Sequence, residues 1–427
     1  MTDSVLIQIA ATTLLGVAVL HTFCVPVFAR LAHRSGPHAG FWRALSEVEA
    51  VFGVWSFVLL IYMSAVAGAP AAAAYMDSRN FTEPLFVFAI MVVAASRPIT
   101  ELMGMLVLAV ARLLPVKRQL AVYFVVLTVV PLAGSLVTEP AAMTLAALLL
   151  RDGYFRRPGH ERFKYMTLAV LLVNVSIGGV LSAYAAPPVL LVAETFGWDS
   201  MFMLSHFGWR AAIAVVINAL LLTIYYRKDL QEGDVQTHKG VTRDYKNNGV
   251  PASMIAIHLL FLVGIVVFAH HPSIFLGLLM LFIGFTEAYP KYQSRLMIKE
   301  GLLVGFFLAG LVILGGLQKW WLQDLLGGMA PEALFWGAVG LTALTDNAAL
   351  TYLGSLVEGT SDAWRYMLVA GAVTGGGLTV IANAPNPAGF AILKGNFPDE
   401  AISAWGVLLA AIPPTLVAAT LFLIRAS

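Results

Sequence analysis

Two carboxylate residues interrupt long apolar stretches of this 427-residue sequence, and they stand in similar surroundings. Glu139 lies in G-S-L-V-T-E-P-A-A, which runs from Gly134 to Ala142, and Asp346 lies in L-T-A-L-T-D-N-A-A. An ionisable side chain at the centre of a bilayer costs about 2.5–3.5 kcal/mol on insertion scales, so such a residue usually serves a function. We therefore expect Glu139 and Asp346 to bind a cation or a proton.

Residues near each carboxylate could complete an oxygen site. Pro140 removes a backbone donor after Glu139, and the amide of Asn347 can cap a half-helix or coordinate a cation. In the stretch I-A-N-A-P-N-P-A-G, Asn383 and Asn386 stand beside prolines that prevent a regular helix. The remaining candidate ligands carry a hydroxyl or an amide: Ser135, Thr138, Asn174 and Ser182 in the first half, and Thr342 and Thr345 in the second.

Carboxylate, hydroxyl, amide and carbonyl oxygens together form a hard-oxygen set, which suits Na⁺, Li⁺ or H⁺ better than a soft metal. A buried carboxylate can hold a proton or a cation, because desolvation favours the protonated form and a nearby cation favours the charged form. Competition between the two then gives exchange, with Na⁺ at Glu139 and Asp346. No cofactor is expected beyond the transported Na⁺ or Li⁺ and H⁺.

Each candidate also has a purely structural alternative. The carboxylates and asparagines could only cap half-helices, and the threonines could return hydrogen bonds to their own helices. Arg97 and Glu101 stand four residues apart in an apolar stretch, so they can pair on one helix face. We expect a structural ion pair there, with a role in a proton path as the alternative.

The composition indicates a protein that crosses a membrane many times. Hydrophobic residues make up 59% of the chain and charged residues only 12%, with a mean hydropathy of +0.82. Soluble domains carry about 25% charged residues, so a soluble enzyme, a disordered scaffold and a nucleic-acid binder are excluded. Stretches long enough to cross a hydrocarbon layer of about 30 Å occur at about 4–29, 48–70, 84–114, 203–226, 251–270, 272–289, 299–317 and 402–424.

The positions of arginine and lysine predict the topology. Most of the 26 basic residues fall in loops. These loops can all lie on one side of the membrane only if two of the apolar regions are re-entrant hairpins, which enter and leave by the same face. The sequence thus predicts an all-α polytopic membrane protein of the cell inner membrane, with about ten transmembrane crossings, two re-entrant hairpins and periplasmic termini. The hairpins are expected at about 120–151 and 332–358, the broken helices at about 166–196 and 364–396, and a cytoplasmic linker at 227–250. The basic stretch Tyr154–Lys164 predicts an interfacial helix.

The two halves of the chain, 1–226 and 251–427, are expected to be inverted-topology repeats. The hairpin stretches align when Glu139 is placed on Asp346, and the stretch Ile177–Pro188 aligns with Thr374–Pro385. Five crossings in each half would force the halves into opposite orientations. Inverted repeats with broken helices, and sites near the middle of the membrane, are typical of secondary transporters.

The motifs T-E-P-A-A-M-T, T-D-N-A-A-L-T-Y-L-G and I-A-N-A-P-N-P-A-G resemble those of a bacterial family of Na⁺/H⁺ antiporters. This family lies within the ion-transporter superfamily and is related to D-type sodium/proton antiporters and arsenite permeases. The resemblance implies two opposed re-entrant hairpins, homodimers, and a cation site between the hairpin tips and the helix breaks. The Asp346-Asn347 pair matches the antiporter and arsenite branches, whereas Glu139-Pro140 departs from the polar pair found elsewhere.

The expected function is therefore exchange of Na⁺ or Li⁺ for H⁺ by alternating access, in support of pH homeostasis, with the lipid bilayer and small cations as partners. The alternative is a cation-coupled carrier of a small oxyanion or carboxylate, similar to arsenite or citrate carriers. Carboxylates at both tips would repel such an anion unless cations bound first. The sequence lacks G-x-S-G, G-x-G-D and H-E-x-x-H motifs, so an intramembrane hydrolase is not expected.

Overall fold

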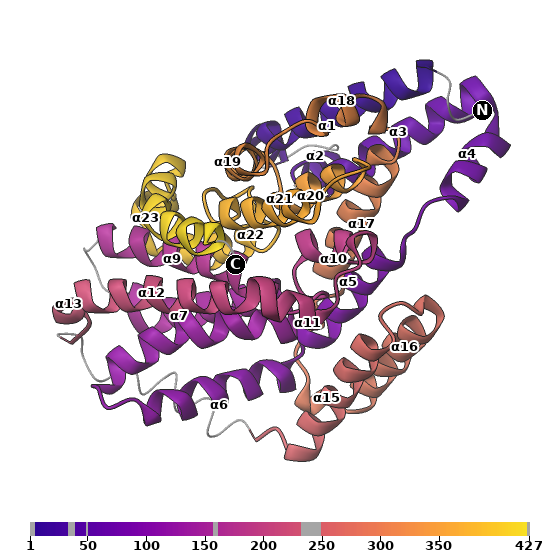
Figure 1. Cartoon of the computed structure of the whole chain (residues 1–427). Helices are drawn as coiled ribbons and strands as arrows, with labels where there is room; N and C mark the ends of the chain where they lie inside the picture. The colour runs from indigo at the N-terminus through magenta and orange to yellow at the C-terminus, as the bar shows by residue number, and fades with distance from the viewer. Residues whose placement is uncertain (1–4, 33–38, 48–49, 157–160, 232–248, 425–427) are drawn as a thin grey trace.

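The computed structural model describes residues 5–32, 39–47, 50–156, 161–231 and 249–424, and its regular elements within these ranges are all helical (Figure 1). The α-helices of the first half are α1 (Val5–Ala32), α2 (Ala39–Leu45), α3 (Ala50–Ala67), α4 (Ala69–Asp77), α5 (Thr82–Ala94), α6 (Arg97–Leu113), α7 (Arg118–Val137), α8 (Glu139–Leu150), α9 (Glu161–Gly178), α10 (Pro187–Phe196), α11 (Ser200–Met203), α12 (Trp209–Tyr225) and α13 (Arg227–Gln231).

The second half begins after the predicted linker, of which residues 232–248 lie outside the described ranges. Its α-helices are α15 (Ala252–Val267), α16 (Pro272–Ala288), α17 (Ile298–Gly315), α18 (Lys319–Leu326), α19 (Pro331–Thr342), α20 (Asn347–Ser355), α21 (Asp362–Gly375), α22 (Asn386–Leu393) and α23 (Ala404–Leu423). Short 3₁₀ or π segments are η1 (Arg151–Phe155), η2 (Gly179–Leu181), η3 (Leu204–Gly208), η4 (Pro290–Tyr292), η5 (Lys394–Asn396) and η6 (Pro398–Glu400).

The structure shows a multi-pass membrane protein. Among the described residues, seven helical segments are long and apolar enough to cross a membrane, and an eighth is counted if the bent pair α5–α6 is one span. Predicted spans 251–270 and 272–289 form α15 and α16, which have 16 and 17 residues and are slightly shorter than the others. The total of ten crossings therefore remains a prediction.

The predicted single span at 84–114 is bent in the structure. Helices α5 and α6 meet at an angle of 67°, with the break at Ala95 and Ser96. Pro98 lies in the first turn of α6, where its missing N–H costs nothing and its fixed φ favours a helix start. An apolar run cannot distinguish one straight helix from two, so the sequence analysis missed this break.

The two predicted hairpins have arms of unequal length. Helix α7 has 20 residues and could cross a membrane alone, whereas α19 has 12. Pro131 stands inside α7 without ending it, because neighbouring helices can satisfy the backbone group that a proline frees. Helix α8 packs along α7. Whether the two hairpins are re-entrant is not decided by these lengths and contacts, and it remains a prediction.

The basic stretch after the first hairpin does not form the expected interfacial helix over its described residues. Tyr154 and Phe155 belong to the π turn η1 that continues α8, and Phe163 belongs to the first turn of α9. All three rings are buried and pack on one another or on Tyr123, so aromatic contacts draw this stretch into the core. Residues 157–160 lie outside the described ranges.

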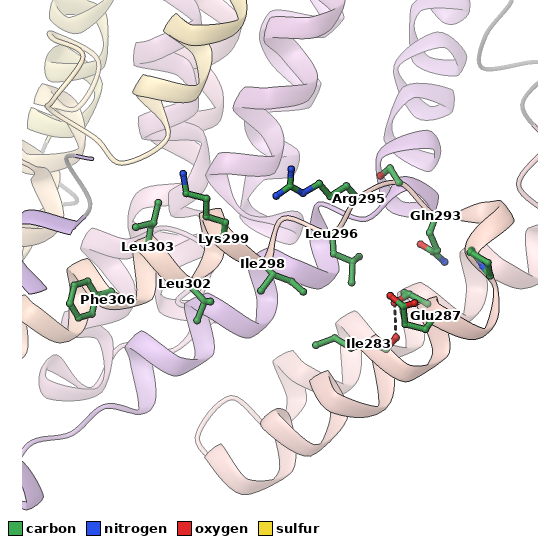
Figure 2. Close-up of a pocket in the computed structure, with 13 residues that line it drawn as sticks. Ile283, Glu287, Gln293, Arg295, Leu296, Ile298, Lys299, Leu302, Leu303 and Phe306 are labelled. Carbon is green, nitrogen blue, oxygen red and sulfur yellow. Dashed lines mark hydrogen bonds between the residues drawn. The ribbon is translucent and has the colours of Figure 1, made fainter. Parts of the chain in front are cut away.

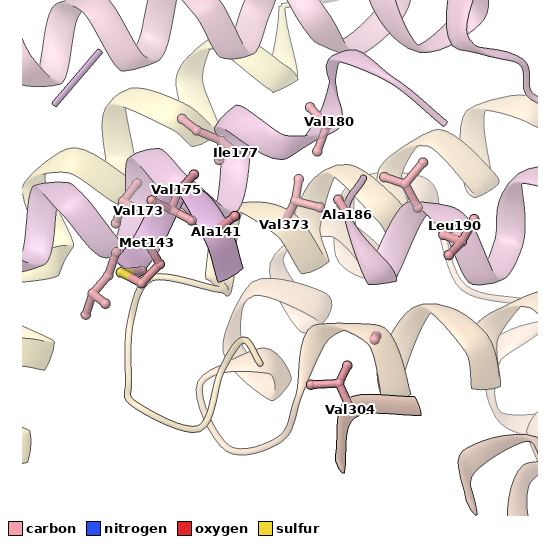
Figure 3. Packing of buried hydrophobic residues seen from close by; sticks show 14 of the residues in the cluster. Ala141, Met143, Val173, Val175, Ile177, Val180, Ala186, Leu190, Val304 and Val373 are labelled. Atoms are coloured by element: carbon pink, nitrogen blue, oxygen red, sulfur yellow. The ribbon is translucent and has the colours of Figure 1, made fainter. Parts of the chain in front are cut away.

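Equivalent elements of the two halves exchange contacts across the core. Helix α10 of the first half packs against α20 of the second, and α22 of the second half packs against α8 of the first. Helices α9 and α12 likewise pack against α23. Figure 3 shows part of the shared core, in which Ala141 of α8, Val173 of α9 and Val373 of α21 are buried together. This packing brings the two hairpin tips and the two helix breaks into the interior of the protein.

Candidate functional site

Each hairpin turns at the start of its second arm, and the two turns use their polar residues differently. Thr138 precedes α8 with a φ of +83°, a left-handed conformation that a β-branched residue rarely adopts. Asp346 precedes α20 with extended backbone, and its Oδ1 accepts hydrogen bonds from the backbone N–H of Ala348 at 2.8 Å and Ala349 at 3.3 Å. Asp346 is therefore an N-cap, and Glu139 is the first residue of its helix.

The two carboxylates consequently do not occupy equivalent positions, although the sequence alignment places one on the other. By helix position, Glu139 corresponds to Asn347, and Thr138 corresponds to Asp346. Contacts at the helix breaks support the same correspondence between the two tips. A Cβ on Gly179 would overlap the Glu139 carboxylate, and a Cβ on the matching Gly376 would lie 2.8 Å from Nδ2 of Asn347. The repeat is thus shifted by one residue at the tips.

Glu139 is fully buried and binds the opposite half of the chain. Its Oε2 accepts a hydrogen bond of 2.9 Å from Nδ2 of Asn383, which lies in the break between α21 and α22. Its Oε1 has no hydrogen-bond partner among the described residues and faces Gly179. Asn383 in turn lines one small cavity together with Asp346. The tip of the first hairpin, the break of the second half and the second tip therefore form one polar centre.

A small cavity opens beside Asp346. It has a volume of about 30 Å³, which is enough for a water molecule or a bare monovalent cation. Its polar lining residues are Thr22, Thr345, Asp346 and Asn383. On the apolar side, Phe52 of α3 and Phe307 of α17 lie against each other at 5.1 Å between ring centroids. Asp346 is partly exposed, whereas Glu139 is fully buried, so the two carboxylates differ in their access to solvent.

Buried oxygens without partners gather around the tips and breaks. Buried polar atoms are nearly always hydrogen-bonded, so a group of exceptions indicates a place for a ligand or water. No partner lies among the described residues for the following side-chain oxygens: Thr138 Oγ1, Glu139 Oε1, Thr342 Oγ1, Asn347 Oδ1, Thr374 Oγ1, Asn383 Oδ1 and Asn386 Oδ1. Neutral oxygens with carboxylates are suited to a hard cation.

Four predicted ligands have other hydrogen bonds in the structure. Ser135 Oγ donates to the Gly178 carbonyl and Ser182 Oγ to the Ser135 carbonyl, both at 2.6 Å, so these serines fasten α7 to the first break. Asn174 Nδ2 donates to the Leu127 carbonyl at 2.8 Å, and its Oδ1 accepts from Asn218. Thr345 Oγ1 donates to the carbonyl of Leu341, four residues earlier, at 3.1 Å. Thr345 nevertheless lines the cavity.

Two hydroxyl residues near the second break were missed by the sequence analysis. Ser176 Oγ donates to the carbonyl of Val373 at 2.7 Å, which joins α9 to α21, and a Cβ on Gly376 would overlap this hydroxyl. Thr374 is fully buried, and its Oγ1 is one of the oxygens without a partner among the described residues. Both residues lie one turn or less before a Gly-Gly pair, which was the available signal.

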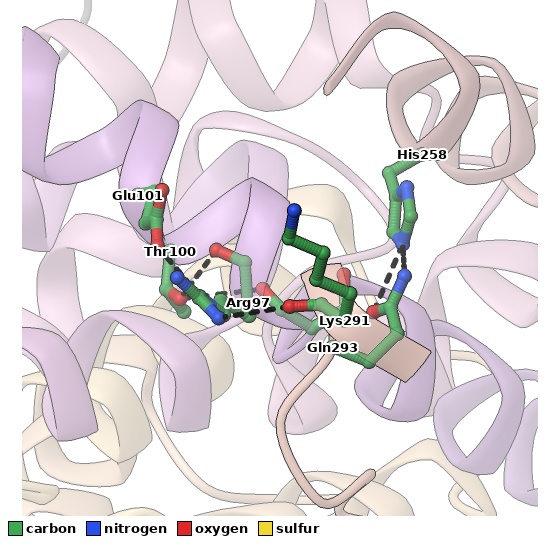
Figure 4. Close-up of polar contacts among 7 residues, drawn as sticks. Arg97, Thr100, Glu101, His258, Lys291 and Gln293 are labelled. Carbon is green, nitrogen blue, oxygen red and sulfur yellow. Dashed lines mark hydrogen bonds and ion pairs between the residues drawn. The ribbon is translucent and has the colours of Figure 1, made fainter. Parts of the chain in front are cut away.

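Arg97 and Glu101 form the expected ion pair, with 2.7 Å between Nε and Oε1. The pair lies at the start of α6, and neither residue lines the cavity at Asp346. Arg97 also donates from Nη1 to the carbonyl of Lys291 at 3.5 Å, so it links α6 to the connector before α17 (Figure 4). This placement suits a structural role, and a part in a proton path stays a prediction.

A family model described as "Putative Na+/H+ antiporter" matches residues 6–425, nearly the entire chain. No curated protein matches the chain. The family match spans both hairpins and both helix breaks. The chain therefore belongs to this family of Na⁺/H⁺ antiporters, which are membrane transporters.

Proposed function

We propose that this protein exchanges Na⁺ or Li⁺ for H⁺ across the inner membrane by alternating access, in support of pH homeostasis. The observation that carries the proposal is the polar centre formed by Glu139, Asn383 and Asp346, where a hairpin tip of one half binds the helix break of the other. Neutral oxygens without partners among the described residues surround these groups. The family and the membrane-helical fold support a cation/proton transporter.

Exchange follows if protons and Na⁺ compete for the same carboxylates. Asp346 faces the cavity, where a cation can reach its oxygens, and Asn383 and Thr345 offer neutral oxygens there. Glu139 lies behind this cavity with its hydrogen bond to Asn383. A cation favours the deprotonated form of the carboxylates, and its departure in a buried setting favours protonation. The fixed negative charge therefore alternates between Na⁺ and H⁺, one replacing the other.

An oxyanion or carboxylate carrier fits the tips poorly. Such carriers bind anions at the positive N-termini of half-helices. The backbone N–H groups at the start of α20 are already bonded to the Asp346 carboxylate, and α8 begins with Glu139. An anion would have to displace one carboxylate and approach the other. We therefore propose cation exchange and not anion transport.

Further features of the proposal rest on the family resemblance and on the charge pattern of the loops. We propose that the protein forms homodimers, that its termini are periplasmic and that its 227–250 linker is cytoplasmic. We propose that transport requires both halves of the chain, since the polar centre takes Glu139 from the first half and Asn383 from the second.

The decisive experiment measures the apparent Na⁺ affinity of the purified protein in proteoliposomes at several pH values. Protonation removes the charge that holds Na⁺, so the affinity of the wild type should weaken as pH falls, by up to about tenfold per pH unit for each proton that one Na⁺ displaces. Asp346→Asn keeps an oxygen but cannot carry a proton, and it should abolish exchange. Asp346→Glu should retain some exchange with an altered Na⁺/Li⁺ preference, because the reach of the ligand sets cation choice.

The matched control is Asp362→Asn, which removes a carboxylate from the first turn of α21, where the side chain is 95% exposed. This variant should behave as the wild type. An active Asp346→Asn together with a Na⁺ affinity that does not change with pH would contradict the proposal. Anion uptake that is retained or improved in Asp346→Asn would favour the carrier alternative.

A further inference from the structure

A wide groove lies on the outside of the protein, far in sequence from the polar centre. It has a volume of about 960 Å³ and runs between the last turns of α16, the connector 289–297 and the first turns of α17 (Figure 2). Its walls are mainly apolar and include Ile283, Leu296, Ile298, Leu302, Leu303 and Phe306. Ligand pockets of about 300–1,000 Å³ with apolar walls and a few polar groups are typical of sites for small amphipathic molecules.

The wall made by the connector is held in place by polar contacts. The side chain of Gln293 lies against the ring of His258 on α15, with 3.0 Å between Gln293 Nε2 and His258 Nε2. Arg97 of α6 donates to the carbonyl of Lys291 from the other side (Figure 4). The groove is therefore bordered by a connector that two neighbouring helices position.

The position of the groove relative to the membrane determines what can fill it. Helix α17 is long and apolar enough to cross a membrane, so the connector that precedes it lies near the membrane surface. The apolar walls on α16 and α17 then extend to the depth of the lipid chains. An apolar surface without partner atoms loses dispersion contacts, which lipid chains can restore. A phospholipid, which has both a headgroup at the membrane surface and chains at this depth, is therefore the molecule that can fill the groove.

The charged residues of the groove select among phospholipid headgroups. Arg295 and Glu287 both line it and are exposed, and neither has an ion-pair partner among the described residues. Lys299 also lines the groove, but its ammonium is paired with Glu47 at 2.8 Å. The groove therefore offers one cation and one anion. A headgroup with a phosphate and an ammonium complements both, whereas a purely anionic headgroup would leave Glu287 facing negative charge.

We propose that this groove binds a phospholipid of the phosphoethanolamine class. The phosphate binds the guanidinium of Arg295, a geometry in which arginine forms two parallel hydrogen bonds. The ammonium donates to the Glu287 carboxylate, and the acyl chains lie along Leu302 and Phe306. This site is separate from the cation centre, so it stands or falls independently of the transport proposal.

The test is native mass spectrometry of the full-length protein in a non-ionic detergent with defined lipids. Palmitoyl-oleoyl phosphatidylethanolamine, phosphatidylcholine and phosphatidylglycerol are added at equal concentrations, and the fraction of protein that retains each lipid is measured. Phosphatidylcholine has the same net charge as phosphatidylethanolamine but no N–H donor. We expect phosphatidylethanolamine to be retained about tenfold better than the other two, because hydrogen bonds between charged groups are the strongest kind.

The variants separate the two headgroup contacts. Glu287→Gln should remove the advantage of phosphatidylethanolamine over phosphatidylcholine, and Arg295→Gln should lower retention of all three lipids about tenfold. The matched controls are Glu300→Gln on α17 and Arg156→Gln after η1, neither of which lines the groove, and both should bind as the wild type. Soluble phosphoethanolamine without chains should not compete.

Several results would overturn the proposal. One is equal retention of phosphatidylglycerol and phosphatidylethanolamine by the wild type. Another is unchanged selectivity in Glu287→Gln. Competition by soluble phosphoethanolamine would show a site for the free headgroup and not for a lipid. A dimer that holds no lipid would show that a second copy of the chain covers the groove.

Discussion

The hydrogen bond between Glu139 and Asn383 connects residues 244 positions apart. It places a carboxylate from the first hairpin against an amide from the second helix break, where neither group contacts bulk solvent. Burying a carboxylate is costly unless it is hydrogen-bonded, protonated or paired with a cation. One of its oxygens has no partner among the described residues, so the charge on Glu139 depends on what occupies the centre.

The first prediction concerns the charge on Glu139. Glu139→Gln should abolish cation-dependent proton movement in everted vesicles while the protein stays in the membrane. The glutamine oxygen can still accept the hydrogen bond from Asn383, so the shape of the tip is kept and only the charge is lost. Glu101→Gln, which removes the partly buried carboxylate of the ion pair on α6, tests whether the loss of a carboxylate away from the polar centre has the same effect. Normal transport by Glu139→Gln across pH would make Glu139 a structural cap only.

The second prediction separates the backbone and the hydroxyl of Thr138. A non-glycine residue in a left-handed conformation costs about 1–3 kcal/mol, so Thr138→Gly should raise the free energy of unfolding by about 1 kcal/mol. Thr138→Val keeps the strain and the shape but removes Oγ1. If the hydroxyl is a ligand, both variants should weaken the apparent Na⁺ affinity. Their thermal unfolding temperatures should differ, because only Thr138→Gly relieves the backbone strain and should therefore unfold at the higher temperature. Unchanged Na⁺ affinity in both would leave Thr138 with a role in the turn alone.

At the scale of elements, both helix breaks begin where a glycine lets two helices come close. A Cβ on Gly178 would lie 2.6 Å from the carbonyl oxygen of Pro131 on α7, and a Cβ on Gly375 would lie 2.6 Å from that of Val339 on α19. These two glycines occupy matching places in the two halves. The first arm of each hairpin is therefore packed tightly against the helix that breaks, which fixes the depth of the break relative to the tip.

The third prediction tests this packing at the residue that follows. Gly179→Ala should displace the Glu139 carboxylate and abolish exchange, because the new methyl group overlaps it. Overpacking of this kind typically costs about 1–3 kcal/mol of stability. Gly284→Ala in α16 is the matched control, since a Cβ there meets no heavy atom within 4 Å. Proteoliposome transport and thermal unfolding of both variants check the prediction, and an active Gly179→Ala would show that the tip can move away.

At the scale of the whole molecule, the question is how many times the chain crosses the membrane. The described helices include seven or eight that satisfy length and hydropathy, and the sequence predicts ten crossings with two hairpins. The difference lies in α7, which is long enough to cross, and in α15, α16 and the second broken helix, whose α-helical part α21 has 14 residues. Helix length alone does not decide between these counts.

The fourth prediction decides the topology with reporter fusions. Most basic residues lie in loops that share one face under the ten-crossing scheme, so a reporter after Ser427 should be periplasmic and one within 227–250 cytoplasmic. Paired alkaline phosphatase and green fluorescent protein fusions give opposite signals on the two sides. A reporter at Lys117 should match the linker if 120–151 is re-entrant and enters from the cytoplasm, and so should one at Arg156. Opposite signals at Lys117 and Arg156 would mean that the first hairpin crosses the membrane.

The sequence by itself determined the helical membrane class, the Arg97–Glu101 pair and the places where helices end near Glu139, Asp346 and Asn383. These are local properties, set by apolar runs, by four-residue spacing on a helix and by prolines and glycines that interrupt it. They need no knowledge of the rest of the chain.

Only the tertiary structure decided which polar groups meet. It placed Asn383 on Glu139, joined Ser176 to the carbonyl of Val373, and shifted the hairpin register so that Glu139 corresponds to Asn347. It also directed Asn174 and Ser182 to hydrogen bonds away from the centre. Each of these contacts depends on how helices distant in sequence pack, and packing responds to the shape of whole helix faces, a property that no short stretch of sequence contains.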